Sequence, residues 1–588
     1  MNSKNNYIYI VNTLDLDTHL ENVAFHNLIA IDTETTGLCP HTNKIRLLQI
    51  SCESEPTLII DLFKTEVTDL LIKILASEHI TKIFHNGIFD IQMLWGAGIP
   101  VSPPYFDTQL ASILVDNGLG LTHSLKVVTH RHLGIELDKT EQDSNWSVPK
   151  LTSEQLDYAA EDALVLLPLE RELSKKIKNL KLERARDIEF GCLTGAAMLE
   201  FKGMKLDLPQ LKVLQKEYSE LKKKLKAELE NSLQLDDVSN STTLPLFPSE
   251  YKTKINLNSH HQVKKAFNLL GVPLTSTDKD HLSIYIGQNE LIQKFVDYRK
   301  ANDYLTKYLN KLERFINPKT GRIHTSVFQI GAATGRMSVR NPPLQQIPNN
   351  TKFRSLFVPE EGYDLIVADY SQMELRIIAE VCGDETLTLA YQQGLDIHSL
   401  TASVILDKPL DQVTKEDRRL AKPVNFGLVY GMMPASLVVY ARSNYGVAIA
   451  QKEAEEISAK FFKRFPGLLE WHKQIKSQNT KIVRTLSGRI RKWSYPAPFT
   501  EAVNTPVQGL NADITKLAVS LLWAPLIKYD ACIIALVHDE IVVEVPHAHA
   551  VETRNLVVEL MQQAGSTFLR HIPCVVDAAI CKSWAEKA

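Results

Sequence analysis

Two acidic residues that lie far apart in the chain each stand at the end of a short apolar run. Asp369 follows the run 365–368, and Asp539 lies between the runs 533–537 and 541–543. Short runs rich in β-branched residues are typical of buried strands, so we expect a sheet with carboxylates at its strand ends. Two such carboxylates side by side would bind a pair of divalent metal ions about 4 Å apart, as phosphoryl transfer requires. The alternative is two ordinary acids at strand ends.

A stripe of cations and aromatic residues lies between these acids. Its members occur at every fourth position: Arg418, Lys422, Phe426 and Tyr430. Residues four apart share one face of a helix, so the cations would hold the phosphates of a nucleoside triphosphate while the aromatic rings stack on its base. Pro423 removes one backbone hydrogen bond from such a helix. The alternative is a surface helix with a basic end and a packed aromatic end.

With these segments the chain resembles the family A DNA polymerases, the group that includes bacterial DNA polymerase I and its Klenow fragment. The segments 369–376, 418–431 and 537–540 are similar to the family's motifs A, B and C. Three more similar segments follow the family order: 334–338, 344–348 and 504–514. Several motifs in one order, from about residue 190 to the end, are far more specific than a lone short pattern.

The resemblance implies roles for the acids and their neighbours. Asp369 and Asp539 would ligate the catalytic metals, with help from the Tyr370 carbonyl. His538 and Glu540 would lie near the primer terminus, and Glu540 is counted among the catalytic residues. All five lie within the motifs named above.

The resemblance also implies how nucleotide and DNA are held. Arg418 and Lys422 would hold the triphosphate, and Lys422 would protonate the leaving pyrophosphate. Phe426 and Tyr430 would stack near the incoming base, and Glu374 would exclude a 2′-hydroxyl. The remaining expected contacts are Gln372 and His398 for the nucleotide, and Arg336 and Gln508 for the minor groove. The chain departs from the family at Thr500, Pro343 and Gln346, which would lie along the template–primer groove.

The first part of the chain carries a second set of acids. Asp32 and Glu34 follow an apolar run, and residues i and i+2 of a strand point to one face. Tyr158 and Asp162 are four apart and share a helical face. Together with Asp90, they resemble the DEDD 3′–5′ exonucleases in the tyrosine variant. The alternative for any one of these motifs alone is an ordinary pair of acids.

This likeness implies a second two-metal site. Asp32, Glu34, Asp90 and Asp162 would hold the ions, and Tyr158 would orient the attacking water. The stretch 125–173, which includes Leu137-Asp138-Lys139, resembles the ribonuclease D branch of the superfamily. His85 has no role in this scheme and is expected to be structural.

We therefore expect an α/β multidomain protein, with a ribonuclease H-like exonuclease domain followed by a right-hand polymerase. At 588 residues the chain exceeds what one hydrophobic core organises. The expected segments are an exonuclease domain over 1–185, a thumb over 186–325, a first palm segment over 326–383, fingers over 384–498 and a second palm segment over 499–588.

Two features of some relatives are not expected here. A 5′ nuclease domain has no room, since the exonuclease strand begins near residue 28. The segment 232–258 reads as a loop at the thumb tip and is too short for a thioredoxin-binding insertion. The cations Arg484, Arg489, Arg491 and Lys492 are expected to face the template strand.

Composition sets the remaining expectations. There are 66 basic and 69 acidic residues, no run approaches the roughly 18 apolar residues of a membrane span, and the seven cysteines form no close pair. We expect a monomer in a reducing compartment, the cytoplasm of a bacterium or phage-infected host, with an organelle as the alternative. Its partners would be primer–template DNA and deoxynucleoside triphosphates, without a membrane, and its cofactor would be Mg²⁺, two per active site, with Mn²⁺ as a substitute.

The leading interpretation is a template-directed DNA polymerase with a 3′–5′ proofreading exonuclease, used in DNA replication or repair. The alternative is an enzyme that acts primarily as a ribonuclease D-like 3′–5′ exonuclease on RNA or single-stranded DNA.

Overall fold

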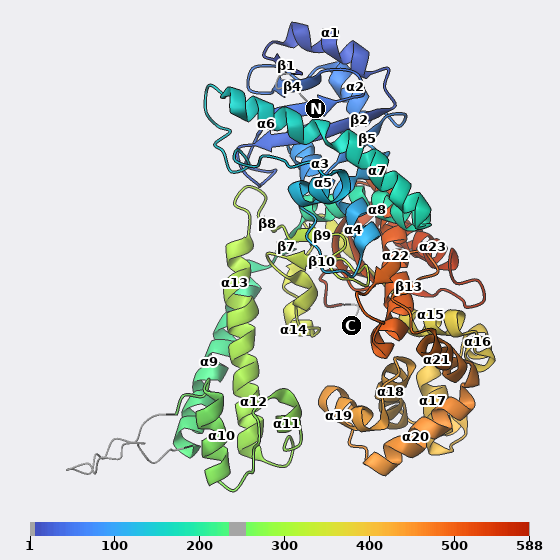
Figure 1. The fold of residues 1–588 in the computed structure, drawn as a ribbon. Coiled ribbons are helices and arrows are strands. Elements are labelled where there is room, and N and C mark those ends of the chain that lie inside the picture. Colours follow the sequence, from blue (N-terminus) through green and yellow to red (C-terminus); the bar gives the residue numbers. More distant parts are fainter. Residues whose placement is uncertain (1–5, 234–254, 587–588) are drawn as a thin grey trace, which may run out of the picture. The chain divides into compact units, whose positions relative to one another are not determined.

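The computed structural model describes residues 6–233 and 255–586. The chain divides into two compact units, each built from segments that are far apart in the sequence (Figure 1). The first unit comprises Met1–Leu206, Ile316–Gly383 and Trp471–Ala588, and the second comprises Asp207–Phe315 and Asp384–Glu470. The predicted loop at 232–258 falls, over residues 234–254, outside the described part of the chain.

The first part of the first unit is built around a mixed six-stranded sheet. Its strand order is β1 (Tyr7–Ile10), β4 (Thr57–Asp61), β3 (Ile45–Ser51), β2 (Leu28–Thr35), β5 (Thr81–Phe84) and β6 (Tyr105–Asp107). Strand β2 is antiparallel to β3 and parallel to β5, and its residues 29–31 are fully buried. Helix α6 (Ser153–Leu164) packs across β2, β3 and β4, so its inner face reaches the end of β2.

The remaining helices around this sheet follow in chain order. They are α1 (Thr13–Val23), α2 (Asp69–Ala76), α3 (Gly87–Gly96), α4 (Thr108–Asp116), α5 (Leu125–Leu133) and α7 (Leu166–Asn179). Several begin at side-chain caps; Thr152 at α6, for example, forms a reciprocal capping box with Gln155. Local sequence therefore fixes where these helices start.

A second sheet, antiparallel and four-stranded, lies in the same unit. Its order is β15 (Cys532–Val537), β16 (Glu540–Pro546), β12 (Tyr363–Tyr370) and β17 (Val576–Cys581). The helices that pack around it and against one another are α8 (Glu183–Lys202), α15 (Met373–Cys382), α22 (Phe499–Ile527) and α23 (Ala550–Ser566). The unit also holds the short strands β7 (Met204–Leu206), β8 (Arg322–Ile323), β9 (Ser326–Phe328), β10 (Ser338–Arg340), β11 (Phe357–Val358), β13 (Ile482–Arg484) and β14 (Ile490–Lys492).

Helix α22 is the core helix of this part of the unit. Among the described residues it is the one helix long and apolar enough to cross a membrane by length and composition, but 61% of its apolar window is buried inside the protein. It also carries Asp513 and Lys516, which are 0% and 2% exposed. Buried ionic groups of this kind identify α22 as a helix packed among protein elements.

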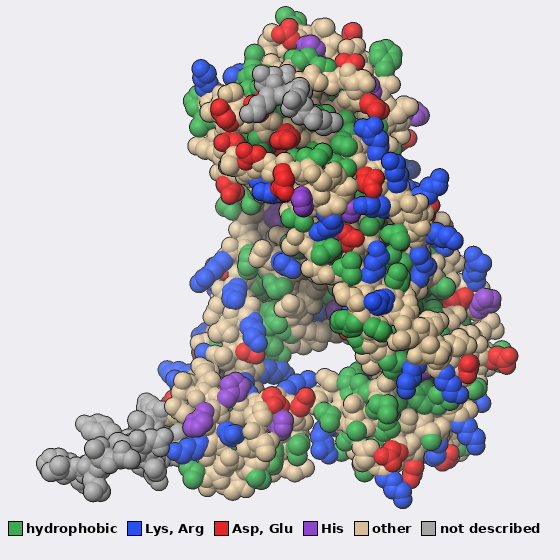
Figure 2. All heavy atoms as spheres, viewed as in Figure 1, with side chains coloured by type: hydrophobic (Ala, Val, Ile, Leu, Met, Phe, Trp, Pro, Cys, Tyr) green, Lys and Arg blue, Asp and Glu red, His purple; other side chains and the backbone are tan. Residues whose placement is uncertain are grey.

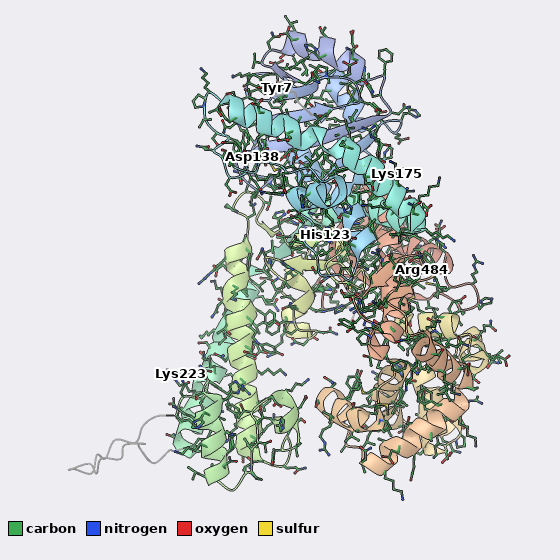
Figure 3. All side chains as sticks on the ribbon, in the orientation of Figure 1. Tyr7, His123, Asp138, Lys175, Lys223 and Arg484 are labelled. Atoms are coloured by element: carbon green, nitrogen blue, oxygen red, sulfur yellow. The ribbon has the colours of Figure 1, made fainter. Side chains whose placement is uncertain are left out.

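The second unit is helical. One part packs α9 (Leu208–Ser232) against α12 (Glu290–Asp303), which continues through the π-helical segment Tyr304–Leu309 into α13 (Asn310–Leu312). Side chains of α10 (His260–Leu269) and α11 (Lys279–Ser283) join the buried cluster between α9 and α12. The other part contains α16 (Glu385–Gln392), α17 (Ile397–Leu406), α18 (Lys415–Val429), α19 (Pro434–Tyr445) and α20 (Gln451–Arg464). The lysine-rich helix α9 carries Lys223 (Figure 3).

The two segments of the second unit, 207–315 and 384–470, are shorter than the predicted thumb (186–325) and fingers (384–498). Residues 186–206 pack with the first unit, since α8 lies against α22 and β15. Residues 471–498 also belong to the first unit. On the visible face, basic and acidic side chains are interspersed, as a nearly balanced charge composition would give (Figure 2).

Candidate active sites

Three carboxylates converge at the end of strand β2. Asp32 and Glu34 lie two residues apart on β2, and Asp162 projects from α6, which packs on that strand. One carboxylate oxygen from each lies within 4.8 Å of the others. The strand and helix periodicities that the sequence suggested therefore bring these three acids together.

The fourth predicted acid, Asp90, lies beside this group but outside the 4.8 Å cluster. It is in the first turn of α3 and accepts a hydrogen bond of 2.6 Å from the Thr33 hydroxyl, between Asp32 and Glu34 on β2. Burial raises the pKa of Asp90 to about 7. Its charge is in turn one cause of the raised pKa of Asp32.

The electrostatics of the cluster favour a bound cation. Burial, followed by repulsion from neighbouring carboxylates, raises the pKa values of Asp32 and Glu34 well above their ordinary range. A divalent ion would remove that repulsion, and carboxylate oxygens are the ligands that hard cations such as Mg²⁺ take. The donor set present here therefore fits a divalent metal centre.

Tyr158 and an unpredicted lysine complete the cluster. The Tyr158 ring is buried and lies 6.2 Å from the Trp146 ring, and burial followed by the nearby negative charges raises its pKa. The Lys139 ammonium lies 2.5 Å from Asp162 Oδ2 and 3.4 Å from the Tyr158 hydroxyl. The sequence signal for Lys139 was its place in the ribonuclease D-like stretch, which gave it no role.

His85 lies in the same domain and is satisfied by local hydrogen bonds. Its Nδ1 lies 2.8 Å from the Thr108 hydroxyl and its Nε2 3.0 Å from the His123 carbonyl. Burial lowers its pKa to about 3, so the ring is neutral at ordinary pH. These contacts are those of a structural histidine.

The two acids predicted to bind the polymerase metals, Asp369 and Asp539, lie on neighbouring elements of the second sheet. Antiparallel pairing of β12 with β16 places Asp369 opposite Glu540, the residue that follows Asp539. Asp539 occupies the turn from β15 to β16, where His538 has a left-handed backbone (φ 61°). Burial, followed among nearby charges by Glu374, raises the pKa of Asp539 to about 6. The register brings the two motifs to one end of one sheet.

Two other residues expected at this site have firm partners. Glu540 accepts hydrogen bonds from Arg354 Nη1 at 3.1 Å and from the Trp584 indole at 2.7 Å. The buried Tyr370 side chain donates to the Met561 carbonyl at 2.8 Å. The Glu540 carboxylate is therefore tied to the protein framework in this structure.

Arg336 and Glu374, expected at the minor groove and the sugar, form an ion pair with each other. Glu374 lies in the first turn of α15, whose N-cap Gln372 has a left-handed backbone (φ 52°). Gln508 lies half-buried on α22. The first unit thus contains every predicted polymerase residue outside the 384–470 segment.

The predicted stripe forms in the second unit, on α18. Its four members are half-exposed, whereas 423–425 and 427–429 are buried, so the stripe is one accessible face of the helix. Tyr430 is the C-cap rather than a helical residue, and Pro423 is accommodated within the helix. The four residues therefore share one face, as their spacing predicted.

A residue that the sequence did not suggest holds one end of this stripe. Asp396, the N-cap of α17, pairs with Arg418 through Nε at 2.8 Å and Nη2 at 3.0 Å. Although burial acts to raise the pKa of Asp396, hydrogen bonds from Arg418 and Ser399 hold it well below its ordinary range. The predicted contact His398 is buried, and its Nδ1 lies 2.9 Å from the Asn425 amide.

One expected template contact is wrong. Arg489 is 2% exposed and pairs with Glu189 and Asp513 in the interior of the first unit. Arg484 donates to backbone carbonyls of Lys181 and Gly488, and Arg491 pairs with Glu501. The sequence of a turn-rich segment does not show whether the side chain of a cation faces solvent or a buried acid.

Comparisons with known proteins identify the families to which the two parts of the chain are similar. The family "DNA polymerase family A" matches residues 213–586, and "3'-5' exonuclease" matches residues 7–178. DNA polymerase I of Aquifex aeolicus is 34% identical over 581 residues, which cover 95% of each chain. DNA polymerase I of Pseudomonas aeruginosa is 29% identical over 99% of this chain and 66% of its own length.

A solved structure shares the fold over nearly the whole chain. It is the POL domain of Pol1 from M. smegmatis in complex with DNA primer-template and dNTP, with a TM-score of 0.84 and 25% identity, and the match covers 98% of this chain and 99% of that one. The matched polymerase family spans more than half of the present sequence. The chain therefore belongs to DNA polymerase family A, and it is a DNA-directed DNA polymerase that also carries a 3′–5′ exonuclease domain.

Proposed function

We propose that this polymerase extends primer 3′ ends at a magnesium site formed by Asp369 and Asp539, and that it proofreads them at a second magnesium site formed by Asp32, Glu34, Asp90 and Asp162. The register of β12 with β16 carries the first assignment, since it brings Asp369 next to the turn that holds Asp539. The clustered oxygens of Asp32, Glu34 and Asp162 support the second.

The polymerase residues would position the reacting groups and neutralise charge. Phosphoryl transfer needs an in-line arrangement and stabilisation of developing negative charge, both of which bound divalent ions supply. Arg418 and Lys422 would neutralise the triphosphate, with Lys422 placed to give a proton to the departing pyrophosphate. Phe426 and Tyr430 would stack beside the incoming base, and Glu374 would leave no room for a 2′-hydroxyl.

The exonuclease residues would act on a single-stranded 3′ end. Tyr158 would orient the attacking water through its hydroxyl, which is fixed beside Asp162. The four carboxylates would hold the metal ions, Mg²⁺ in the cell and Mn²⁺ as a substitute in vitro. A terminus that is mispaired would melt and transfer to this second site.

The expected ligands are primer–template DNA and deoxynucleoside triphosphates, as in the complex of the M. smegmatis relative. We assign residues 207–315 and 384–470 to the thumb and fingers, and the sheet of β12, β15, β16 and β17 to the palm. We expect a monomer located in the cytoplasm, and the relatives named above come from bacteria.

Paired substitutions test the two sites separately. In Asp369→Ala, extension of a labelled primer by dNTPs should fall by at least about a thousandfold, because the lost metal ligand has no substitute. Degradation of a single-stranded oligonucleotide should persist. In Asp32→Ala, degradation of the single-stranded oligonucleotide should be lost while primer extension persists. The assignment fails if Asp369→Ala still extends primers at the wild-type rate.

A further inference from the structure

The segment after α5 delivers one lysine side chain into the exonuclease site. Leu137 is 2% exposed and anchors the segment in the core, whereas Asp138 turns outward and caps the Thr140 backbone N–H. Figure 3 labels Asp138 on this segment. The next side chain, Lys139, is 15% exposed and reaches inward.

Lys139 contacts two of the residues assigned to the reaction. Its ammonium lies 2.5 Å from Asp162 Oδ2, 3.4 Å from the Tyr158 hydroxyl and 4.9 Å from the centre of the Tyr158 ring. It therefore bridges the carboxylate and the phenol along one face of α6. Because the hydroxyl oxygen and one carboxylate oxygen accept from the same ammonium, Lys139 restrains both side chains.

The same ammonium brings a positive charge to the metal-binding carboxylates. Asp162 contributes one of the three oxygens that lie within 4.8 Å of one another. Charge attraction to Lys139 also acts on Asp32 and Glu34, lowering pKa values that burial raises. A divalent ion that binds these carboxylates would meet a cation already tethered beside them.

We propose that Lys139 is a positioning residue of the exonuclease site that fixes Asp162 and Tyr158 and competes, as a tethered cation, with divalent metal for the carboxylate cluster. The inference rests on the proposed exonuclease function of this cluster. It predicts two effects of opposite direction: removal of the charge should tighten metal binding and slow the reaction.

A purely structural role would behave differently. If Lys139 only packed against Tyr158, its loss would loosen the cluster and weaken metal binding together with activity. The direction of the change in metal affinity therefore separates the two explanations, and it is measured without turnover.

The experiment compares Lys139→Met, Lys139→Gln and Lys139→Arg in the full chain. Calorimetric titration with MnCl₂ measures metal binding, and Asp162→Asn identifies the heat that belongs to the exonuclease site. Lys139→Met and Lys139→Gln should bind Mn²⁺ at that site at least threefold more tightly than the wild type, whereas Lys139→Arg should match it. Lys150→Met, in the same segment but exposed, is the control for loss of one positive charge.

Kinetics at saturating Mg²⁺ on a single-stranded oligodeoxynucleotide test positioning. The kcat of Lys139→Met should fall about tenfold, with KM within twofold and partial rescue by Lys139→Arg, while primer extension stays at the wild-type rate. Weaker or unchanged Mn²⁺ binding, or an unchanged kcat, would overturn the proposal. If the wild type neither degrades the oligonucleotide nor shows heat that Asp162→Asn removes, the exonuclease function itself fails.

Discussion

The half-buried carboxyl of Glu200 makes the stability of the first unit depend on pH. It lies on α8 and accepts a hydrogen bond of 2.7 Å from the Val327 backbone N–H. Burial raises its pKa from 4.5 to about 7. The folded protein therefore keeps a proton on Glu200 at pH values where the unfolded chain has released it.

The resulting pH dependence is testable with Glu200→Gln. Because the folded-state pKa is the higher one, Glu200 makes the free energy of unfolding fall as pH rises from about 4.5 to about 7. A glutamine keeps an acceptor for Val327 but has no proton to lose. Thermal unfolding should show the variant more stable than the wild type by on the order of 1–3 kcal/mol at pH 8, and by nothing at pH 4.5.

Glu21→Gln, on the exposed side of α1, is the matched control and should follow the wild type at both pH values. Parallel curves for Glu200→Gln and the wild type between pH 4.5 and pH 8 would refute this account of Glu200.

Among single residues, the sequence predicted those side chains whose position follows from local periodicity. Asp32 and Glu34 share a strand face and Tyr158 and Asp162 share a helix face, and the structure brings three of these four side chains into the carboxylate cluster with Tyr158 beside it. Lys139 was beyond reach, because its loop has no period that fixes a direction. The partners of buried Arg489 were also beyond reach, since they depend on packing between distant segments.

At the element scale, strands β12, β15 and β16 and helices α6 and α18 formed where apolar runs and four-residue spacing indicated. The register between the strands was not predictable from the sequence. A one-residue slip of β16 against β12 would move Glu540 away from Asp369 and turn every side chain of β16 to the other face of the sheet. Register is decided by the packing of both sheet faces, here against α22, α23 and α8.

The junction of α17 and α18 carries a prediction at the same scale. Asp396 caps the first helix and holds the Arg418 guanidinium of the second through two hydrogen bonds. A guanidinium held in one orientation loses less entropy on binding a phosphate. Asp396→Ala should therefore raise KM for dNTPs by about three- to tenfold in steady-state primer extension, with a smaller change in kcat.

Asp407→Ala provides the comparison for Asp396→Ala. Asp407 is the C-cap of the same helix α17 and pairs with Lys460, away from the stripe. The KM of Asp407→Ala for dNTPs should stay at the wild-type value. An unaltered KM in Asp396→Ala would show that Arg418 needs no such support.

At the scale of the whole first unit, a buried ionic network joins elements from three parts of the sequence. Glu189 of α8 pairs with Arg489 and Lys516, and Arg489 also pairs with Asp513; all four are at most 2% exposed. The two positive and two negative charges balance. The network also explains a motif glycine, because a Cβ at Gly335 (φ 87°) would lie 2.8 Å from Arg489 Nε.

Removal of one charge from this network should destabilise the unit as a whole. Glu189→Gln leaves Arg489 and Lys516 with too little negative charge in a buried site, which costs about 3–5 kcal/mol. Denaturant unfolding should show that loss, and heat inactivation of primer extension and of single-strand degradation should shift together, since α8 packs against α3 of the exonuclease part and against β15 of the second sheet. Glu53→Gln, which breaks the exposed pair with Arg171, should cost less than about 1 kcal/mol. Unfolding of Glu189→Gln within 1 kcal/mol of the wild type would mean that the network contributes little to holding these segments together.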